Sequence, residues 1–264
     1  MLLASMLAAL PSGLDPARVH LVDVHPRGES PRNFLFRGNN PVTDGHFNLT
    51  ALVDAMRAAA ASECATSLPE AFLLVDLDLE NPSDPGFLAE LRYWRAHKDQ
   101  GYALSWPIYG SALDVSKTPF EKRLVTKGTW AIDGHADYLP ERLATTRALL
   151  LNESAALPTV LYAHCNAGCD RTGEFIGAYA MTYLGYNVTT AMGEACRQCG
   201  RCPNFYATQS LSWWCLTLEQ SGHAGLGDCR RIATCEYLKD CNASHPTHPA
   251  SPCPTSHPRR SIGH

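Results

Sequence analysis

A cysteine, an arginine and a threonine stand close together in the segment from His164 to Thr172, which reads His-Cys-Asn-Ala-Gly-Cys-Asp-Arg-Thr. Apolar residues before it and a helical pattern after it predict a strand, a tight loop and a helix N-terminus. Backbone N–H groups and the helix dipole attract anions at such a terminus, so a thiol placed there is stabilised as a nucleophilic thiolate. Arg171 could hold two phosphate oxygens with its fork of donors. This spacing indicates phosphoryl transfer to sulfur, followed by hydrolysis.

The elements that must position this loop alternate between strands and helices. The spacing of apolar residues predicts helices over 51–61, 86–97 and 139–151 and strands over 72–79, 102–108 and 157–163. Such alternation predicts an α/β fold, with a central, mostly parallel sheet flanked by helices. Ligands of these sheets bind beyond the carboxyl ends of the strands, where Cys165 falls. After the loop, Phe175, Ile176 and Tyr179 belong to a wide apolar stripe that predicts a buried helix ending at Gly185.

The loop resembles the active-site loop of the cysteine-based phosphatases, the protein tyrosine and dual-specificity superfamily. That pattern is His-Cys, two residues, Gly, two residues, Arg, then Ser or Thr, and every fixed position is matched. Residues 173–185, Pro203-Asn204 with the later Gln209, and residues 36–41 are also similar to segments of the family. The resemblance covers about two thirds of the chain. It implies the cysteine-phosphatase fold, here with a cysteine-rich C-terminal extension, and hydrolysis of phosphomonoesters through a phosphocysteine intermediate.

The resemblance implies a role for each residue of the loop. Cys165 is the expected nucleophile, and Arg171 is expected to stabilise the phosphate in the transition state. Thr172 would donate its hydroxyl to the thiolate and assist breakdown of the phosphocysteine, or cap the following helix. Gln209 is a weak candidate for orienting water, although an exposed helix residue is the favoured interpretation. The expected phosphate-binding set, with His164 as support of the loop, is His164, Asn166, Ala167, Gly168, Cys169, Asp170 and Arg171.

A general acid must protonate the leaving oxygen, and two aspartates compete for this role. Asp133 lies thirty-two residues before Cys165, the usual place of the mobile-loop acid in dual-specificity phosphatases. Asp170 lies inside the loop, as in some lipid-directed members that resemble this Asp-Arg-Thr run. Asp133 is favoured over Asp170. Asp137 is a weaker third candidate, since it could simply cap the helix at Leu139.

Eight of the eleven cysteines fall between Cys196 and Cys253, which predicts a disulfide-stapled C-terminal region. Zinc binding by Cys196, Cys199 and Cys202 is less favoured than disulfides, and neither a metal nor a cofactor is expected. With Cys165 free, ten cysteines remain to pair. Cys169 could trap Cys165 in a reversible disulfide, or simply pack under the loop.

The expected organisation begins with a possible signal peptide, or its remnant, at residues 1–13. A phosphatase domain at 30–220, a cysteine-rich extension at 221–243 and a disordered tail at 244–264 follow. The cysteines and four glycosylation sequons favour a secreted glycoprotein of the secretory lumen or the extracellular space. The sequons begin at Asn48, Asn152, Asn187 and Asn242.

A net charge of −4 gives no general attraction to nucleic acid, and no apolar run is long enough for a transmembrane segment. The expected partner is a phosphorylated protein or a small phosphoester, and the oligomeric state stays open. The favoured activity is a phosphotyrosine or dual-specificity protein phosphatase. The alternatives are a phosphoinositide or phospho-sugar phosphatase, a catalytically dead phosphate-binding module, and a thiol oxidoreductase using Cys196 and Cys199. No lysine lies between Cys165 and Arg171, which argues against highly phosphorylated inositols, while the Asp-Arg-Thr run argues mildly for lipid substrates.

Overall fold

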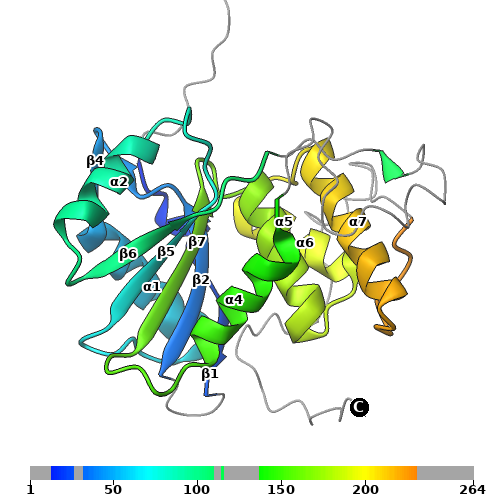
Figure 1. Cartoon of the computed structure of the whole chain (residues 1–264), viewed down its shortest axis with the longest axis horizontal. Helices are drawn as coiled ribbons and strands as arrows, with labels where there is room; N and C mark the ends of the chain where they lie inside the picture. The colour runs from blue at the N-terminus through cyan, green and yellow to red at the C-terminus, as the bar shows by residue number, and fades with distance from the viewer. Residues whose placement is uncertain (1–12, 27–31, 110–113, 116–136, 231–264) are drawn as a thin grey trace, which may run out of the picture.

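The computed structural model describes residues 13–26, 32–109, 114–115 and 137–230 of the chain (Figure 1). Its strands are β1 (His20–His25), β2 (Asn33–Asn39), β3 (Val42–Thr43), β4 (His46–Phe47), β5 (Leu73–Asp78), β6 (Gly101–Ser105) and β7 (Thr159–Cys165). Its helices are η1 (Pro16–Arg18), α1 (Leu49–Cys64), α2 (Phe87–Ala96), α4 (Leu139–Leu151), α5 (Asp170–Tyr179), the π-helical turn η3 (Ala180–Leu184), α6 (Val188–Cys199) and α7 (Phe205–Gln220).

The described strands form a five-stranded sheet in the order β1-β2-β7-β5-β6 and a small hairpin of β3 and β4. The pairings β2–β7, β7–β5 and β5–β6 are parallel, and only the edge strand β1 runs antiparallel to its neighbour. Cys165 pairs with Asn39 of β2, and His164 pairs with Asp78 of β5. The predicted mostly parallel α/β sheet is confirmed, and Cys165 lies at the carboxyl end of its central strand, as parallel topology requires.

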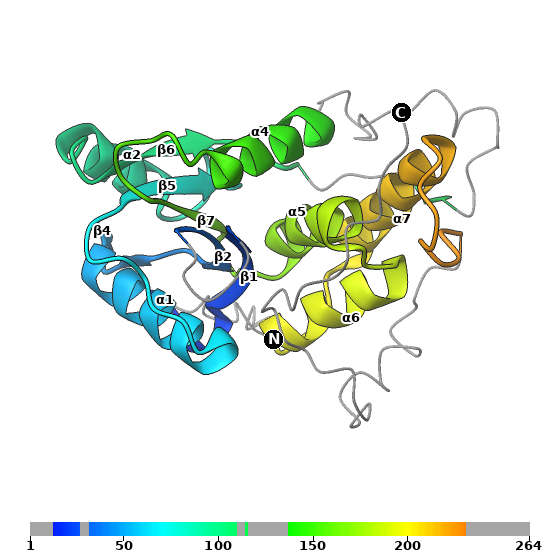
Figure 2. The same cartoon turned by 90° about the horizontal axis from the view of Figure 1, so that it is seen from below.

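Helices cover both faces of the sheet. Helices α1 and α2 lie on one side, and α4, α5, α6 and α7 lie on the other (Figures 1 and 2). Neighbouring residues of β7 face opposite sides, so Tyr162 packs with the α1–α2 core, while Leu161 and Ala163 pack with the α4–α7 core. The two buried layers hold the central strand rigidly, and this rigidity fixes the start of the loop after Cys165.

The helices at 51–61, 86–97 and 139–151 are confirmed within a few residues of their predicted ends. The predicted stripe after the loop is buried as expected, with Phe175 and Tyr179 fully enclosed. That segment continues from α5 into η3 and ends at Gly185, whose φ is +75°. Strand β1 belongs to the sheet although it precedes the domain boundary predicted at residue 30. The predicted tail at 244–264 and most of the predicted signal segment lie outside the described residues.

Disulfides attach α6 and α7 to loop segments beside them. Cys215 in α7 is bonded to Cys229, and Cys196 in α6 is bonded to Cys202. A third bridge joins Cys169 of the loop to Cys199 of α6. The preference for disulfides over zinc is confirmed for these described cysteines.

Candidate active site

The loop that follows β7 is short and lies against the end of β2. Cys165 is the last residue of β7 and α5 begins at Asp170, so residues 166–169 make the whole connection. Gly168 has a φ of +68°, a left-handed conformation that favours glycine. A Cβ atom at this position would lie 2.5 Å from the carbonyl oxygen of Gly38 in β2. Only glycine therefore lets the loop approach the neighbouring strand so closely.

Two arginines from the N-terminal part of the chain hold carbonyl groups of the loop. Arg37 of β2 donates to the carbonyl oxygen of Gly168 and to Oε1 of Gln198, the latter at 2.9 Å. Arg18 donates to the carbonyl oxygen of Ala167 at 2.7 Å. The first N–H groups of α5 have no acceptor within the helix. Because the two arginines occupy the loop carbonyl groups, the N–H groups at the start of α5 remain available to bind an anion.

Cys165 is the free cysteine of the described part of the chain, and its residue is 2 % exposed. Two guanidinium groups respond to its charge. Burial lowers the pKa of Arg37 to about 10, and the nearby Cys165 counteracts this fall. Burial also opposes the charge of Arg171, but Cys165 and Asp84 together raise the pKa of Arg171 above its usual value. The predicted nucleophile is thus a free, buried cysteine that lies close to the guanidinium groups of Arg37 and Arg171.

Arg171 lies in the first turn of α5, and one nitrogen of its guanidinium, Nη1, is hydrogen-bonded to the protein. Nη1 donates to Oδ2 of Asp84 and, at 3.5 Å, to the carbonyl oxygen of Leu79. Nε and Nη2 make no hydrogen bond to the described residues, so two donors are available for two phosphate oxygens. Asp84 fixes the orientation of the fork before a substrate arrives.

The two predicted general acids have different outcomes. Asp133 lies outside the described residues. Both carboxylate oxygens of Asp170 bind the guanidinium of Arg201, at 2.9 and 2.7 Å, and the N–H of Asn204 donates to Oδ1 at 2.7 Å. Burial alone would raise the pKa of Asp170, but the bonds from Arg201 and Asn204 lower it below its usual value. Asp170 therefore stays ionised, a state in which it has no proton to give.

Asp137, the third aspartate considered, does not cap α4. The residue at the N-cap position is Tyr138, in a left-handed conformation, with no side-chain cap. Asp137 is buried, and its Oδ1 accepts from the N–H of Tyr109 at 3.2 Å. This carboxylate joins the start of α4 to the segment after β6.

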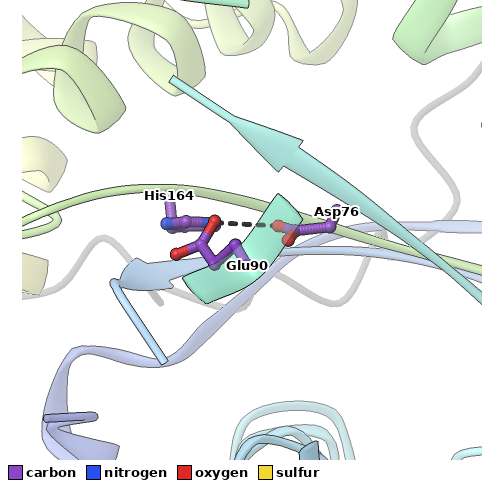
Figure 3. A group of neighbouring side chains, drawn as sticks. All are labelled: Asp76, Glu90 and His164. Atoms are coloured by element: carbon purple, nitrogen blue, oxygen red, sulfur yellow. Dashed lines mark hydrogen bonds and ion pairs between the residues drawn. The ribbon is translucent and has the colours of Figure 1, made fainter. Parts of the chain in front are cut away.

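His164 lies on the opposite face of β7 from Cys165 and is fully buried. Its Nε2 lies 2.8 Å from Oδ1 of Asp76 and 3.4 Å from Oε2 of Glu90 (Figure 3). Burial lowers the pKa of His164, but the charges of Glu90 and Asp76 outweigh burial and raise it well above its usual value. His164 thus anchors the strand end through Asp76 and Glu90, on the face away from Cys165, and its expected role as support of the loop stays a prediction.

Thr172 and Gln209 are both buried, which changes the interpretation of each. The N-cap residue of α5 is Cys169, so Thr172 does not cap this helix. The hydroxyl of Thr172 has no hydrogen-bond partner among the described residues, and it is available to a thiolate. Gln209 is not an exposed helix residue as the sequence suggested: its Oε1 accepts from the N–H of Val115 at 2.8 Å. That contact ties α7 to the segment that follows β6.

The predicted disulfide switch between Cys165 and Cys169 is not formed. Cys169 is bonded to Cys199 of α6, and Cys165 is free. The bridge is possible because the loop and the last turn of α6 lie side by side, which the sequence pattern does not show. Cys169 therefore attaches the phosphate loop to a neighbouring helix.

Sequence reasoning missed the residues that support the loop from other elements. Arg37 had a detectable signal, because a charged residue stands inside the apolar run of β2. Asp84 and Arg18 had none, because each belongs to a polar loop or turn whose partner is distant in the chain. In the sequence, Glu90 is one acidic residue of a helix with no sign that it is buried. Its burial beside His164 depends on how α2 packs on the sheet.

Three of the four predicted glycosylation asparagines are described, and each caps a helix or a turn. Asn48 accepts from the N–H of Ala51 at the start of α1, and Asn187 accepts from the N–H of Thr190 at the start of α6. Asn152 accepts from the N–H and the hydroxyl of Ser154 after α4. Asn242 lies outside the described residues. Capping by asparagine explains these positions without a glycan.

No protein-family model and no curated protein sequence matches the chain. Solved phosphatase structures align with it at low identity. Human DUSP28 is 16% identical with a TM-score of 0.37, over 79% of this chain and 99% of its own. The core catalytic domain of the PP-IP phosphatase SIW14 from S. cerevisiae is 14% identical with a TM-score of 0.38, over 86% and 97%. The PTP-2 phosphatase of Cydia pomonella is 17% identical with a TM-score of 0.34, over 72% and 88%.

The prediction of a secreted glycoprotein is corrected. The asparagines of the three described sequons serve as caps of a helix or a turn. The predicted lumenal location itself stays a prediction. Among the helices that the structure describes, none has the length and apolar character needed to cross a bilayer. In its mostly parallel sheet and in its His-Cys to Arg-Thr loop, the chain resembles the cysteine-based phosphatases.

Proposed function

We propose that this protein is a cysteine-dependent phosphatase that hydrolyses phosphomonoesters in two steps. The Cys165 thiolate attacks phosphorus, the S–P bond forms, and the P–O bond to the substrate alcohol breaks. Water then attacks the phosphocysteine, which releases inorganic phosphate and restores the thiolate. The observation that carries this proposal is a free, buried cysteine at the end of β7, joined by a short loop to α5, with Arg171 in the first turn of that helix.

Proton transfer in the first step is assigned to Asp133, which would protonate the leaving oxygen as the P–O bond breaks. The bonds that Arg201 and Asn204 make to Asp170 support this choice, since they keep that carboxylate ionised. Thr172 would donate its buried hydroxyl to the thiolate that leaves in the second step. Its lack of any other partner among the described residues supports that role.

The proposed substrate is a phosphorylated protein, with phosphotyrosine favoured. Arg171 is the one basic residue of the segment from 165 to 172, so the loop supplies charge for a single phosphate. The neighbouring Arg201 is already neutralised by Asp170, and Arg18 and Arg37 are occupied by loop carbonyls. Extra phosphates of a highly phosphorylated inositol would find no unpaired cation at these described positions.

Hydrolysis of an aryl phosphate by the wild type and by Cys165→Ser and Arg171→Lys variants tests the proposal. We expect no turnover from Cys165→Ser. Arg171→Lys should lose most activity, because lysine keeps the charge and lacks the two-pronged donor. Rapid quenching of the wild type should trap phosphate on Cys165, visible by mass spectrometry. Binding of phosphate without turnover by the wild type would instead identify a phosphate-binding module, and turnover by Cys165→Ser would refute the mechanism.

A further inference from the structure

A buried group of acidic side chains surrounds His164 on the α1–α2 side of the sheet, away from the phosphate loop. Asp76 comes from β5, Glu90 from α2 and His164 from β7, and all three side chains are fully buried. Figure 3 shows the two carboxylates pointing at the same edge of the imidazole ring. One ligand atom from each residue can be chosen so that all three lie within 4.8 Å of one another.

The hydrogen bonds of this group are incomplete. Neither carboxylate oxygen of Glu90 has a hydrogen-bond partner among the described residues, although the residue is completely buried. A buried carboxylate without donors is costly whether or not a positive ring lies nearby. Nε2 of His164 carries a single hydrogen, and that hydrogen is directed to Asp76, the closer of the two carboxylates.

A third carboxylate, that of Asp78, lies on the same face of the sheet. Asp78 pairs directly with His164 across β5 and β7, and it lies on the same face of β5 as Asp76 because it is two residues further along. Its Oδ1 accepts from the N–H of Glu80 at 2.8 Å, whereas its buried Oδ2 has no partner among the described residues. Asp78 therefore adds a third buried carboxyl group beside the three residues whose ligand atoms lie within 4.8 Å of one another.

The geometry of Asp76 is that of a prepared ligand. Its Oδ2 accepts from the indole N–H of Trp94 at 2.7 Å, which leaves Oδ1 as the oxygen that faces Nε2 of His164. Outer hydrogen bonds of this kind orient metal-binding carboxylates. Both strands and α2 are packed in the core, which gives the group a rigid frame.

We propose that His164, Asp76 and Glu90 bind a divalent transition-metal cation of the zinc type. One imidazole nitrogen with carboxylate oxygens suits such an ion better than calcium or magnesium, which prefer oxygen alone. Binding displaces the hydrogen from Nε2 of His164. The ion would tie β5, α2 and β7 together immediately before the nucleophile, as a structural site separate from the proposed phosphatase chemistry.

Elemental analysis of wild-type protein, purified without a metal-chelating resin, tests the site without any activity measurement. We expect about one zinc-type ion per chain. Glu90→Gln should lose it, whereas Glu141→Gln, which changes an exposed acid of α4, should keep it. Circular dichroism would verify that each variant is folded, and Asp76→Asn, which should also lose the ion, replaces Glu90→Gln if that variant does not fold.

Cobalt(II) added to the metal-free wild type distinguishes this site from the cysteines. Ligation by nitrogen and oxygen gives visible d–d bands without the sulfur-to-cobalt charge-transfer band that thiolates produce. Such a spectrum at one equivalent supports the proposal. A charge-transfer band, or purified protein that holds no ion and takes up none, would overturn it, and the acidic group would then be neutralised by protons alone.

Discussion

Gly168 is the residue at which a single methyl group should disable the loop. A Cβ atom there would lie 2.5 Å from the carbonyl oxygen of Gly38, 2.7 Å from its carbonyl carbon and 2.9 Å from the nitrogen of Asn39. All three are backbone atoms of β2. This strand is held between β1, which pairs with it in the antiparallel direction, and β7, which pairs with it in the parallel direction. Since the strand cannot yield, the Gly168→Ala loop must move away from it.

The cost has two parts, and the chain offers a control that separates them. The left-handed conformation costs alanine about 1–2 kcal/mol relative to glycine. Overpacking adds about 1–3 kcal/mol, so Gly168→Ala should lower the free energy of unfolding by roughly 2–5 kcal/mol. Gly185 has a similar φ of +75° with no atom within 4 Å of its Cβ position. Gly185→Ala should therefore show the conformational cost alone.

Urea unfolding and kcat/KM for an aryl phosphate measure both consequences. A displacement of about 1 Å in a catalytic group lowers rates by about 100-fold, so we expect a loss of that order in kcat/KM for Gly168→Ala. Gly185→Ala should keep wild-type kinetics. If the two variants lose equal stability and Gly168→Ala retains full activity, the loop does not depend on its contact with β2 and the reasoning is refuted.

Three further predictions concern the acid, the disulfide and a buried carboxyl. Asp133→Asn should lower kcat for phosphotyrosine by about 100-fold, whereas Asp170→Asn should mainly lower stability, by about 1 kcal/mol, because its partner Arg201 is half exposed; equal kcat losses would contradict this assignment. Cys199→Ser opens the bridge to Cys169, whose sequence separation is 30, and should lower the free energy of unfolding in urea by about 3–4 kcal/mol. Reduction of the wild type should lower it further, because the bridges Cys196–Cys202 and Cys215–Cys229 then open as well, and a variant as stable as the wild type would contradict this prediction. Burial, assisted by the charge of Asp137, raises the pKa of Glu174 well above its usual value. The contribution of protonated Glu174 to the free energy of unfolding is then complete below the unfolded-state pKa of about 4.3. It is lost as pH rises through the folded-state pKa. Glu174→Gln should remove that part of the pH dependence in urea unfolding, and an unchanged profile would show that Glu174 does not titrate this way.

The buried side chains around the loop explain why these predictions needed the tertiary structure. Asp170 and Asp133 were both candidates for the general acid in the sequence. Arg201, in the segment after α6, binds the carboxylate of Asp170 and so argues against Asp170 as the acid. Cys169 had ten possible partners, and the packing of α6 beside the loop selected Cys199. Gln209 was expected to be exposed because a polar helix residue usually faces solvent, and the contact that buries it comes from Val115, distant in the chain.

The sequence by itself determined the alternating helices and strands between residues 51 and 163, the His-Cys to Arg-Thr loop and the position of Cys165 at a strand end. Those features depend on local patterns: apolar runs, glycine where the backbone turns, and fixed spacing between neighbours in the chain. Only the tertiary structure decided which residues hold the loop, namely Arg18, Arg37 and Asp84, and which acids gather around His164. These contacts join residues far apart in the chain, and their selection depends on the register of β2, β5 and β7 and on burial, which one-dimensional spacing does not encode.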